Sequence, residues 1–593
     1  MKSKIYKIMC VACTATALSS CVDTIILPDD ITVGEDFWKT KNDVALMVNS
    51  AYEGMTTQGV MERLLIWGDF RADEMIVSNI EGDIPNQLAE IASVSPQVTN
   101  TFVSWDAFYS VINRCNIVLA KAGEVLEEDP NYTEGDYQTD CSQMLALRSL
   151  CYFYLVRNFR DVPYVDEPFM DSSKSRYFEQ MTPAEVLQKC IESLETAAAN
   201  SIIASSYSDS DWRRVGWFTR DGIHALLADI YLWRASVMHS DADYQKAIDY
   251  CNLVIDSKKA QHKDEGGTIV KKEYPLADGP RAYGNLFVDQ NAEESVFELQ
   301  VRSNLPLCRY LFKYQNNNSQ MGFLKASGIF ASTASTIASA TTSNKVFAAS
   351  DVRMNTTIFS HANDDEVFDI RKMVSDQRST GVTPEAKTAV GRTYGGFAQN
   401  YIIYRLSDVM LMKAEAMVQQ AANDTTGFST EAKAAYEQKL REAFNLVQAV
   451  QQRSLLVTNG TMSEDSLKWG SLSGMKRSGK SGLEQLVMEE RLRELCFEGK
   501  RWYDLMRYNY RHVDGVRYDA LMADQGMESL PANYSEMLSL ATRRDANQQA
   551  GLQAKMRNEA YLYLPIPNSD ILLCPGLKQN PVYASSSSQQ STK

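Results

Sequence analysis

The sequence lacks any uninterrupted apolar run of about 18 residues, so no membrane-spanning helix is expected. It also lacks a basic excess, because 60 Lys and Arg stand against 75 Asp and Glu, for a net charge of -15. Such an acidic chain repels phosphate backbones, which argues against a nucleic-acid partner. With 44% hydrophobic and 23% charged residues, the composition is that of a globular protein and excludes a collagen, a coiled coil or a chain disordered throughout.

Signatures of catalysis and of metal binding are also missing. The five histidines are scattered, and the chain contains no H-E-x-x-H, no G-x-S-x-G and no phosphate-binding loop. The single C-x-x-C joins Cys10 and Cys13, inside a segment that we expect to be removed, so zinc is not indicated. A glycosidase needs only two carboxylates, and no motif singles out a pair among the many acids. We therefore expect no catalytic residue, no metal and no cofactor.

Residues 1–20 have the form of a secretory signal. They begin with three basic residues, Lys2, Lys4 and Lys7, and continue with an apolar run from Ile8 to Leu18 that is too short to span a bilayer. Leu18-Ser19-Ser20-Cys21 then resembles a bacterial lipobox, in which the cysteine is diacylated and becomes the new N-terminus. We expect lipidation at Cys21; the alternative is an ordinary secretory peptide with a chance cysteine. Two or three acyl chains hold a protein stably on a membrane.

Most of the chain after residue 40 shows apolar residues at the spacing of amphipathic helices. Thr182-Pro183-Ala184-Glu185 adds a capping box with Pro at the first helical position, which marks a helix start. Ser481 to Glu484 repeats the S-x-x-E pattern and predicts a second start. The spacing predicts helices at Asp43–Tyr52, Phe102–Leu119, Met144–Arg157, Pro183–Ala198, Ile403–Ala421 and Ala435–Gln452, and two within 219–256.

Small residues and aromatics within 219–256 resemble a tetratricopeptide repeat, whose small residues lie where two helices cross. Weaker matches pair Met144–Arg157 with Pro183–Ala198, and Ile403–Ala421 with Ala435–Gln452. Such repeats stack into a superhelix with a shared core, and we expect a right-handed superhelix here. We expect a mainly α fold, a tetratricopeptide-like superhelix packed against a loop-rich region with a few short strands, one of them Ser295–Leu299.

Helical spacing fails between about 260 and 400, where turn signals such as Gly266-Gly267 predict loops. Loops of this kind often carry function. The expected organisation is a signal peptide at 1–20, a lipidated tether at 21–40, a helical N-terminal half at 41–260, a loop-rich region at 261–400, a C-terminal half at 401–583 and a disordered tail at 584–593.

Three longer motifs follow one another along the C-terminal half. They are R-L-S-D-V-M-L-M-K-A-E-A at Arg405–Ala416, E-E-R-L-R-E-L-C-F-E-G-K-R-W-Y-D-L at Glu489–Leu505, and L-P-I-P-N-S-D-I at Leu564–Ile571. In this order they resemble the SusD/RagB family of outer-membrane nutrient-binding lipoproteins. Trp67–Glu74 is similar to the acidic segment of that family. Cys574 and Val582 depart from the family pattern, which puts only local turns in doubt.

The resemblance implies a function and a location. A family member of this kind is a cell-surface lipoprotein of the outer membrane, attached through its lipid anchor alone. It binds a nutrient, for which we expect an oligosaccharide, and acts without catalysis as the hinged lid of a TonB-dependent, SusC-like barrel. A peptide-binding member is the alternative from the same resemblance. A lipid-anchored glycoside hydrolase and a repeat-based envelope scaffold are further alternatives.

The resemblance also implies that ligand is held by aromatic, Arg and Asn side chains on loops. Aromatics outside the helical patterns gather between 261 and 400, and Asn residues gather between Arg71 and Trp105, a segment that we expect to be a loop. The candidate ligand-binding residues are Arg71, Asn79, Asn86, Tyr283, Tyr310 and Tyr314.

Glu490, Glu494 and Glu498 stand four apart in the second motif, so they share one helix face and could crowd like charges. A catalytic role is one interpretation. Structural pairing with Arg side chains is the other, and it is the interpretation that we favour.

Overall fold

The computed structural model describes residues 37–78, 81–170, 177–263, 268–270, 272–277, 279–301, 311, 322–327, 329–330, 346–348, 350–360, 368–370, 372, 399–458, 461–469, 479–512, 549–556 and 558–584. Cys21, Asn79, Tyr310 and Tyr314 lie outside these ranges, as does all of the expected signal peptide. Helices dominate the described residues, with short strands between them. The mainly α helical-repeat fold that the sequence predicts is confirmed.

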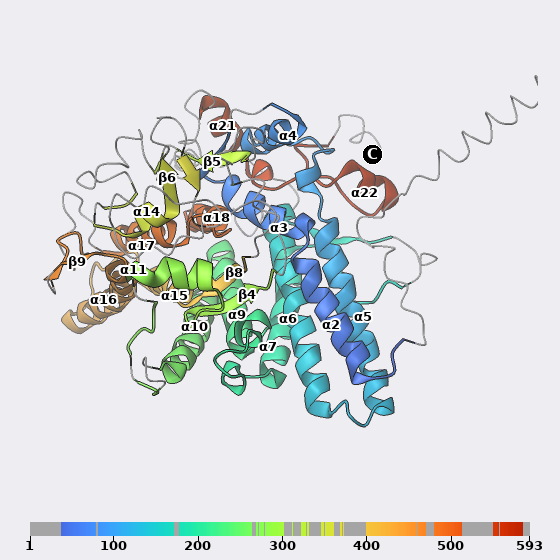
Figure 1. Ribbon diagram of the computed structural model, residues 1–593. Helices are drawn as coiled ribbons and strands as arrows, with labels where there is room; N and C mark the ends of the chain where they lie inside the picture. Colours follow the sequence, from blue (N-terminus) through green and yellow to red (C-terminus); the bar gives the residue numbers. More distant parts are fainter. Residues whose placement is uncertain are drawn as a thin grey trace, which may run out of the picture.

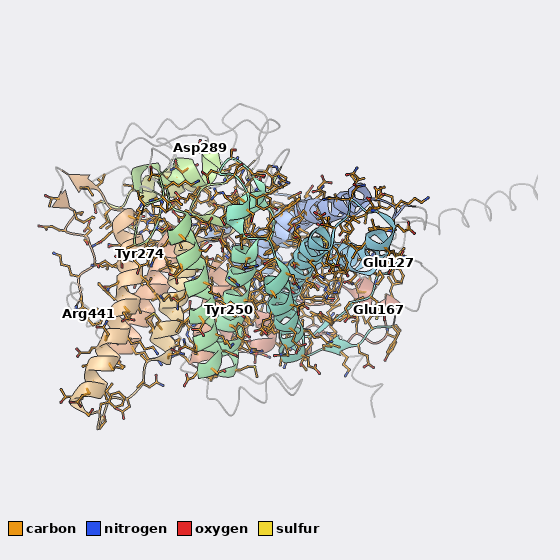
Figure 2. All side chains as sticks on the ribbon, turned by 90° about the horizontal axis from the view of Figure 1, so that it is seen from below. Glu127, Glu167, Tyr250, Tyr274, Asp289 and Arg441 are labelled. Carbon is orange, nitrogen blue, oxygen red and sulfur yellow. The ribbon has the colours of Figure 1, made fainter. Side chains whose placement is uncertain are left out.

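Long helices stand side by side in a row that follows the chain (Figure 1). In order they are α2 (Lys41–Met55), α5 (Asp106–Glu128), α6 (Glu134–Phe159), α7 (Pro183–Asn200), α9 (Arg220–Met238), α10 (Asp241–Gln261), α15 (Leu406–Gln420), α16 (Thr430–Arg453) and α17 (Gly479–Leu495). Each packs against the next, and α16 and α17 both contact α15. Figure 2 shows the row from below, with Glu127 of α5 and Arg441 of α16 at opposite ends and Tyr250 of α10 between them.

The three expected repeat pairs are in contact: α6 with α7, α9 with α10, and α15 with α16. The predicted capping box at the start of α7 is present, since Thr182 Oγ1 accepts from the Glu185 N–H and the Glu185 carboxylate accepts from the Thr182 N–H. From Ser142 onward α6 buries nearly every residue, as its apolar sequence predicts for a central helix.

The second predicted start is wrong. Helix α17 already includes Gly479 and Lys480, so Ser481 lies within it and caps nothing. Glu484 is instead 5% exposed and accepts from Arg511 Nε at 2.8 Å. The S-x-x-E pattern was misleading because Glu484 is buried against α18 (Arg501–Arg511), which provides its partner Arg511.

Shorter helices and turns complete the scaffold. The α-helices are α3 (Gln58–Leu65), α4 (Asp83–Ala92), α8 (Arg213–Gly216), α11 (Gly279–Tyr283), α14 (Arg353–Thr357), α18 (Arg501–Arg511), α21 (Gln549–Met556) and α22 (Asn568–Leu573). The π-helical turns are η1 (Ile66–Phe70) and η4 (Gly284–Asp289), and the 3-10 turns are η2 (Thr101–Val103), η3 (Ala204–Ser206) and η7 (Glu559–Leu562).

The described strands form antiparallel pairs. These are β1 (Met75–Val77) with β5 (Leu324–Ala326), β2 (Val162–Pro163) with β3 (Gln180–Met181), β4 (Ser295–Leu299) with β8 (Tyr401–Arg405), β6 (Ile358–Ser360) with β7 (Phe368–Ile370), and β9 (Val457–Thr458) with β10 (Thr461–Met462). The predicted strand at Ser295–Leu299 is confirmed. In its register Leu299 faces Tyr401, so Gln300 and Asn400 follow at the same end of the pair.

The helix expected from Ile403 begins only at Leu406, because Ile403 belongs to β8. Every residue of β8 is buried, and β-branched or aromatic side chains occupy four of its five positions. A short apolar run of this kind has no period that separates a buried strand from a buried helix. The segment that contains the third motif lies against α6, where the Leu564 N–H donates to the Asn158 carbonyl at 2.8 Å.

Candidate ligand-binding site

Arg71 is buried, with 5% of its surface exposed. Its guanidinium donates to Asn158 Oδ1 at 3.1 Å and to the Leu562 carbonyl, and it lies 4.4 Å from the centre of the Trp502 ring. It borders a cavity of about 10 Å³, which has room for one water at most. Arg71 therefore joins η1 to α6, α18 and η7, and its contact with ligand stays a prediction.

The segment between Arg71 and Trp105 is not the loop that we expected. It holds β1, α4 and η2. Pro85, Leu88 and Ile91 give α4 a buried face, which a pattern this short did not reveal. Asn86 lies on the exposed side of α4, so its side chain is accessible. Its role in binding stays a prediction, like that of Asn79, which lies outside the described residues.

Tyr283 lies where α11 passes into η4 and is 7% exposed. Its ring packs against Phe287, with centroids 5.8 Å apart. Together with Arg353 and Glu494 it lines a cavity of about 30 Å³, enough for roughly two waters and not for a sugar. Any role of Tyr283 toward ligand stays a prediction, as it does for Tyr310 and Tyr314 outside the described residues.

The three glutamates of the second motif lie in a buried ionic network beside that cavity. Arg353 donates to Glu490 Oε1 and to Glu494 Oε2, both at 2.8 Å. Arg405, from the first motif, donates to Glu494 and reaches Glu498 with Nε at 2.9 Å and Nη2 at 2.8 Å. We call these five side chains the motif network. None of the five is more than 9% exposed.

The electrostatics of the motif network favour pairing over catalysis. Burial alone raises the pKa of Glu494, but Arg453 and two further guanidinium groups outweigh it and hold that pKa well below its ordinary value. For Glu498, burial is outweighed in the same way by Arg405 and Lys372, so its pKa is also lowered. A general acid needs a raised pKa, and these carboxylates remain ionised and engaged by cations.

A second set of ion pairs connects α15, α17 and α18. Arg491 donates to Asp408 Oδ1 at 3.0 Å and to Asp504 Oδ2 at 2.9 Å. Arg507 grips Glu415 through two hydrogen bonds of 2.8 Å. Removing one partner of a buried ion pair leaves the other charge uncompensated. These pairs therefore fix how the first and second motifs pack against each other.

The acidic segment near the N-terminus holds the turn before α18, a role that sequence reasoning missed. Asp69 accepts from the backbone N–H groups of Gly499, Lys500 and Arg501 at 2.6, 3.0 and 3.3 Å. Gly499 has φ of +75°, which favours glycine, and a Cβ at Gly68 would lie 2.3 Å from the Gly499 carbonyl oxygen. Gly68-Asp69 was the sequence signal for this role, but the backbone N–H groups that Asp69 binds lie over 400 residues further along the chain.

Two known protein families match separate parts of the chain. The family described as "SusD family" matches residues 309–583, which contain all three C-terminal motifs. The family described as "Starch-binding associating with outer membrane" matches residues 31–232. The chain belongs to the SusD/RagB family. The expected resemblance is thereby confirmed, and the buried ion pairs show how its family motifs hold the fold together.

Relatives of this SusD/RagB-family chain come from Formosa agariphila. "SusD-like protein P38" is 24% identical over 528 residues, which cover 83% of this chain and 89% of that protein. "SusD-like protein P2" is 25% identical over 535 residues, covering 85% and 90%.

Solved structures share the fold. A SusD homolog from Bacteroides thetaiotaomicron aligns with a TM-score of 0.63 at 17% identity, over 92% of this chain and 97% of that one. Surface glycan-binding protein A from the same organism, solved in complex with laminarihexaose, aligns with a TM-score of 0.58 at 19% identity, over 91% and 100%.

Two features are absent from the described residues of the SusD/RagB-family chain. Among them no helix is both long and apolar enough to cross a membrane. Within the same residues, no three His, Cys, Asp or Glu side chains are grouped so that they could hold a metal ion. In the described part of the chain, charged residues of the first and second motifs are held in buried ion pairs.

Proposed function

We propose that this protein is a cell-surface lipoprotein that binds a nutrient oligosaccharide and delivers it, as a lid, to a TonB-dependent outer-membrane barrel, without altering the glycan. Family membership over both halves of the chain carries the proposal. The matched description "Starch-binding associating with outer membrane" supports the location and the ligand class. The neighbour solved with laminarihexaose adds support for a glycan.

The two cavities described above measure about 30 and 10 Å³, so neither of these two can enclose a sugar ring. Asn86, on the exposed side of α4, is open to a ligand at the surface. Asn79, Tyr310 and Tyr314 remain candidates that lie outside the described residues. Arg71 and Tyr283 would then support ligand-facing neighbours from below, because both are buried.

Calorimetric titration of residues 22–593 tests the ligand class. We expect saturable heat with one class among malto-, cello-, laminari-, xylo- and mannohexaose, and the same glycan recovered intact by chromatography. Shortened products would show a glycoside hydrolase. Heat with peptides and none with glycans would show the peptide-binding alternative, and binding of neither would count against nutrient capture.

The anchor is tested by Cys21→Ala in the native host. We expect this variant to leave the membrane fraction and to lose metabolic labelling with a fatty acid. Cys10→Ala, inside the apolar run of the signal, is the matched control and should remain anchored. Copurification of a TonB-dependent barrel with the wild-type protein from detergent extracts tests the partner; its absence would contradict the lid.

A further inference from the structure

The connection between α7 and α9 places three aromatic rings together at the surface. The ring centroids of Trp212 and Trp217 are 5.9 Å apart at an angle of 81°, and those of Tyr207 and Trp217 are 6.5 Å apart at 79°. Trp212 is 37% exposed, and the other two are half-buried. We call these three residues the aromatic corner. This exposure distinguishes the aromatic corner from the aromatic core, because large aromatic side chains are mostly buried.

The aromatic corner is held in shape by a charged pair. The Arg213 guanidinium lies 5.1 Å from the ring centre of Tyr207 and 5.5 Å from that of Trp217. Asp211 fixes the guanidinium through hydrogen bonds of 3.0 Å to Nε and 2.6 Å to Nη2, and it also accepts from the Arg213 N–H at 2.9 Å. The rings are therefore positioned before any ligand arrives, which lowers the cost of binding.

Planar amides border the aromatic corner on the side of β4. A Cβ at Gly216 would lie 2.6 Å from both Trp212 Cε3 and Gln300 Cγ, so these two side chains meet over the glycine. Gln300 Nε2 donates to Asn291 Oδ1 at 2.8 Å, and Gln300 Oε1 accepts from Asn400 at 3.1 Å. Gln300 and Asn400 thus lie at one end of the β4–β8 pair, and Asn291, which precedes β4, is hydrogen-bonded to Gln300.

The exposed charges beside the aromatic corner form ion pairs. Arg213 is paired with Asp211, and Lys263 with Asp209, each at 2.6 Å. Arg214 of α8 is buried and donates to the Asn291 carbonyl at 3.2 Å. Paired surface charges favour a neutral ligand over an ion. Aromatic faces suit the C–H surface of a pyranose, and fixed amide and guanidinium groups suit its hydroxyls.

We propose that the aromatic corner is a sugar-stacking platform that takes a pyranose ring of a neutral oligosaccharide, with Trp212 as its most exposed wall. This inference rests on the proposed function and adds a specific binding surface to it. The platform lies in the connection between α7 and α9, where α8 packs on β4.

Trp212→Ala tests the platform against a matched control, Trp469→Ala. Trp469 is equally exposed at 37% and also packs beside an aromatic ring and an arginine, Phe444 at 5.4 Å and Arg441 at 4.9 Å. It lies with α16 at the end of the helix row, whereas α8 packs on β4 near the middle (Figures 1 and 2). The ligands are the five neutral hexaoses named above, titrated by calorimetry and by tryptophan fluorescence.

We expect Trp212→Ala to weaken binding of the recognised hexaose by at least about tenfold, with Trp469→Ala close to wild type. Trp212→Phe, which keeps an aromatic face, should recover part of the affinity. Binding unchanged in Trp212→Ala would overturn the platform and leave the proposed function standing. Loss of barrel copurification with unchanged glycan affinity would identify the corner as a protein-docking surface instead. Failure of the wild type with every hexaose would overturn the platform as a neutral-sugar site, and peptide binding would then decide the proposed function.

Discussion

The motif network and the aromatic corner differ in how they use polar and aromatic side chains. In the motif network, charged residues are buried, matched by opposite charges and drawn from segments far apart in sequence. In the aromatic corner, aromatic residues from one short segment remain partly exposed around a single ion pair. The residues with the strongest family signal thus serve the fold, while the surface best suited to a ligand carries no family motif.

This contrast has a physical origin. Buried charges tolerate few changes, because removing one partner leaves the other without compensation. An exposed ring can be replaced at small cost to the fold, since its surroundings include solvent. Ligand-binding surfaces can therefore vary between relatives while the ion-paired scaffold beneath them is retained.

Glu494→Ala should cause the largest loss of stability. It leaves Arg353, Arg405 and Arg453 without a shared carboxylate, so we expect the free energy of unfolding to fall by about 3–5 kcal/mol in urea titrations. Glu489→Ala on the same helix is the control, because its carboxylate is 32% exposed and lies 3.9 Å from Arg493. The control should change stability by less than about 1 kcal/mol. Equal losses of unfolding free energy in the two variants would contradict the structural role assigned to the buried motif network.

Asp570→Asn should have a smaller effect on stability, opposite in sign to that of Glu494→Ala. Burial raises the pKa of Asp570 from 3.8 to about 7 in the folded protein. The folded state therefore binds more protons than the unfolded state between about pH 4 and pH 7, and wild-type stability falls as pH rises through that window. The asparagine does not ionise, so the variant should gain on the order of 2 kcal/mol relative to wild type across it.

Urea titrations at several pH values measure this difference. Ser569→Ala is the companion variant, because it removes the hydroxyl that lies 3.4 Å from Asp570 and lowers the Asp570 pKa. It should raise that pKa further, so the loss of stability with rising pH should be larger than in wild type. Glu494 behaves oppositely, because its lowered pKa contributes stability above its ordinary value of 4.5 that is lost in acid. If the difference in unfolding free energy between Asp570→Asn and wild type does not change with pH, the raised pKa assigned to Asp570 is wrong.

Local sequence signals predicted local structure well. The start of α7 followed from Thr182, Pro183 and Glu185 alone, because a capping box is closed within four residues. The β8 strand was misassigned because its apolar run fits either a strand or a helix, and pairing with β4 decided the outcome. The partner of Asp69 could not be found locally, since it lies over 400 residues away.

The site was harder to predict than the fold. Tyr283 was selected for lying outside helical patterns, yet it is buried against Phe287. Trp212 and Trp217 were passed over, although two tryptophans within a polar stretch that also holds Asp211 and Arg213 were a visible signal. Exposure depends on how a connection packs on its neighbours, and α8 packs on β4, a strand from a distant part of the chain.

The sharpest test of the contrast compares Trp502, a buried tryptophan of the second motif, with Trp212, whose truncation should have the smallest effect on stability. Trp502, beneath Arg71, is 1% exposed, so Trp502→Ala should cost about 3–5 kcal/mol of unfolding free energy. Trp212→Ala should cost about 1 kcal/mol or less in the same urea titration, because the ring already faces solvent. If Trp212→Ala instead costs as much as Trp502→Ala, the aromatic corner supports the fold. A small cost combined with weakened glycan binding would mean that its exposed rings are kept for a ligand.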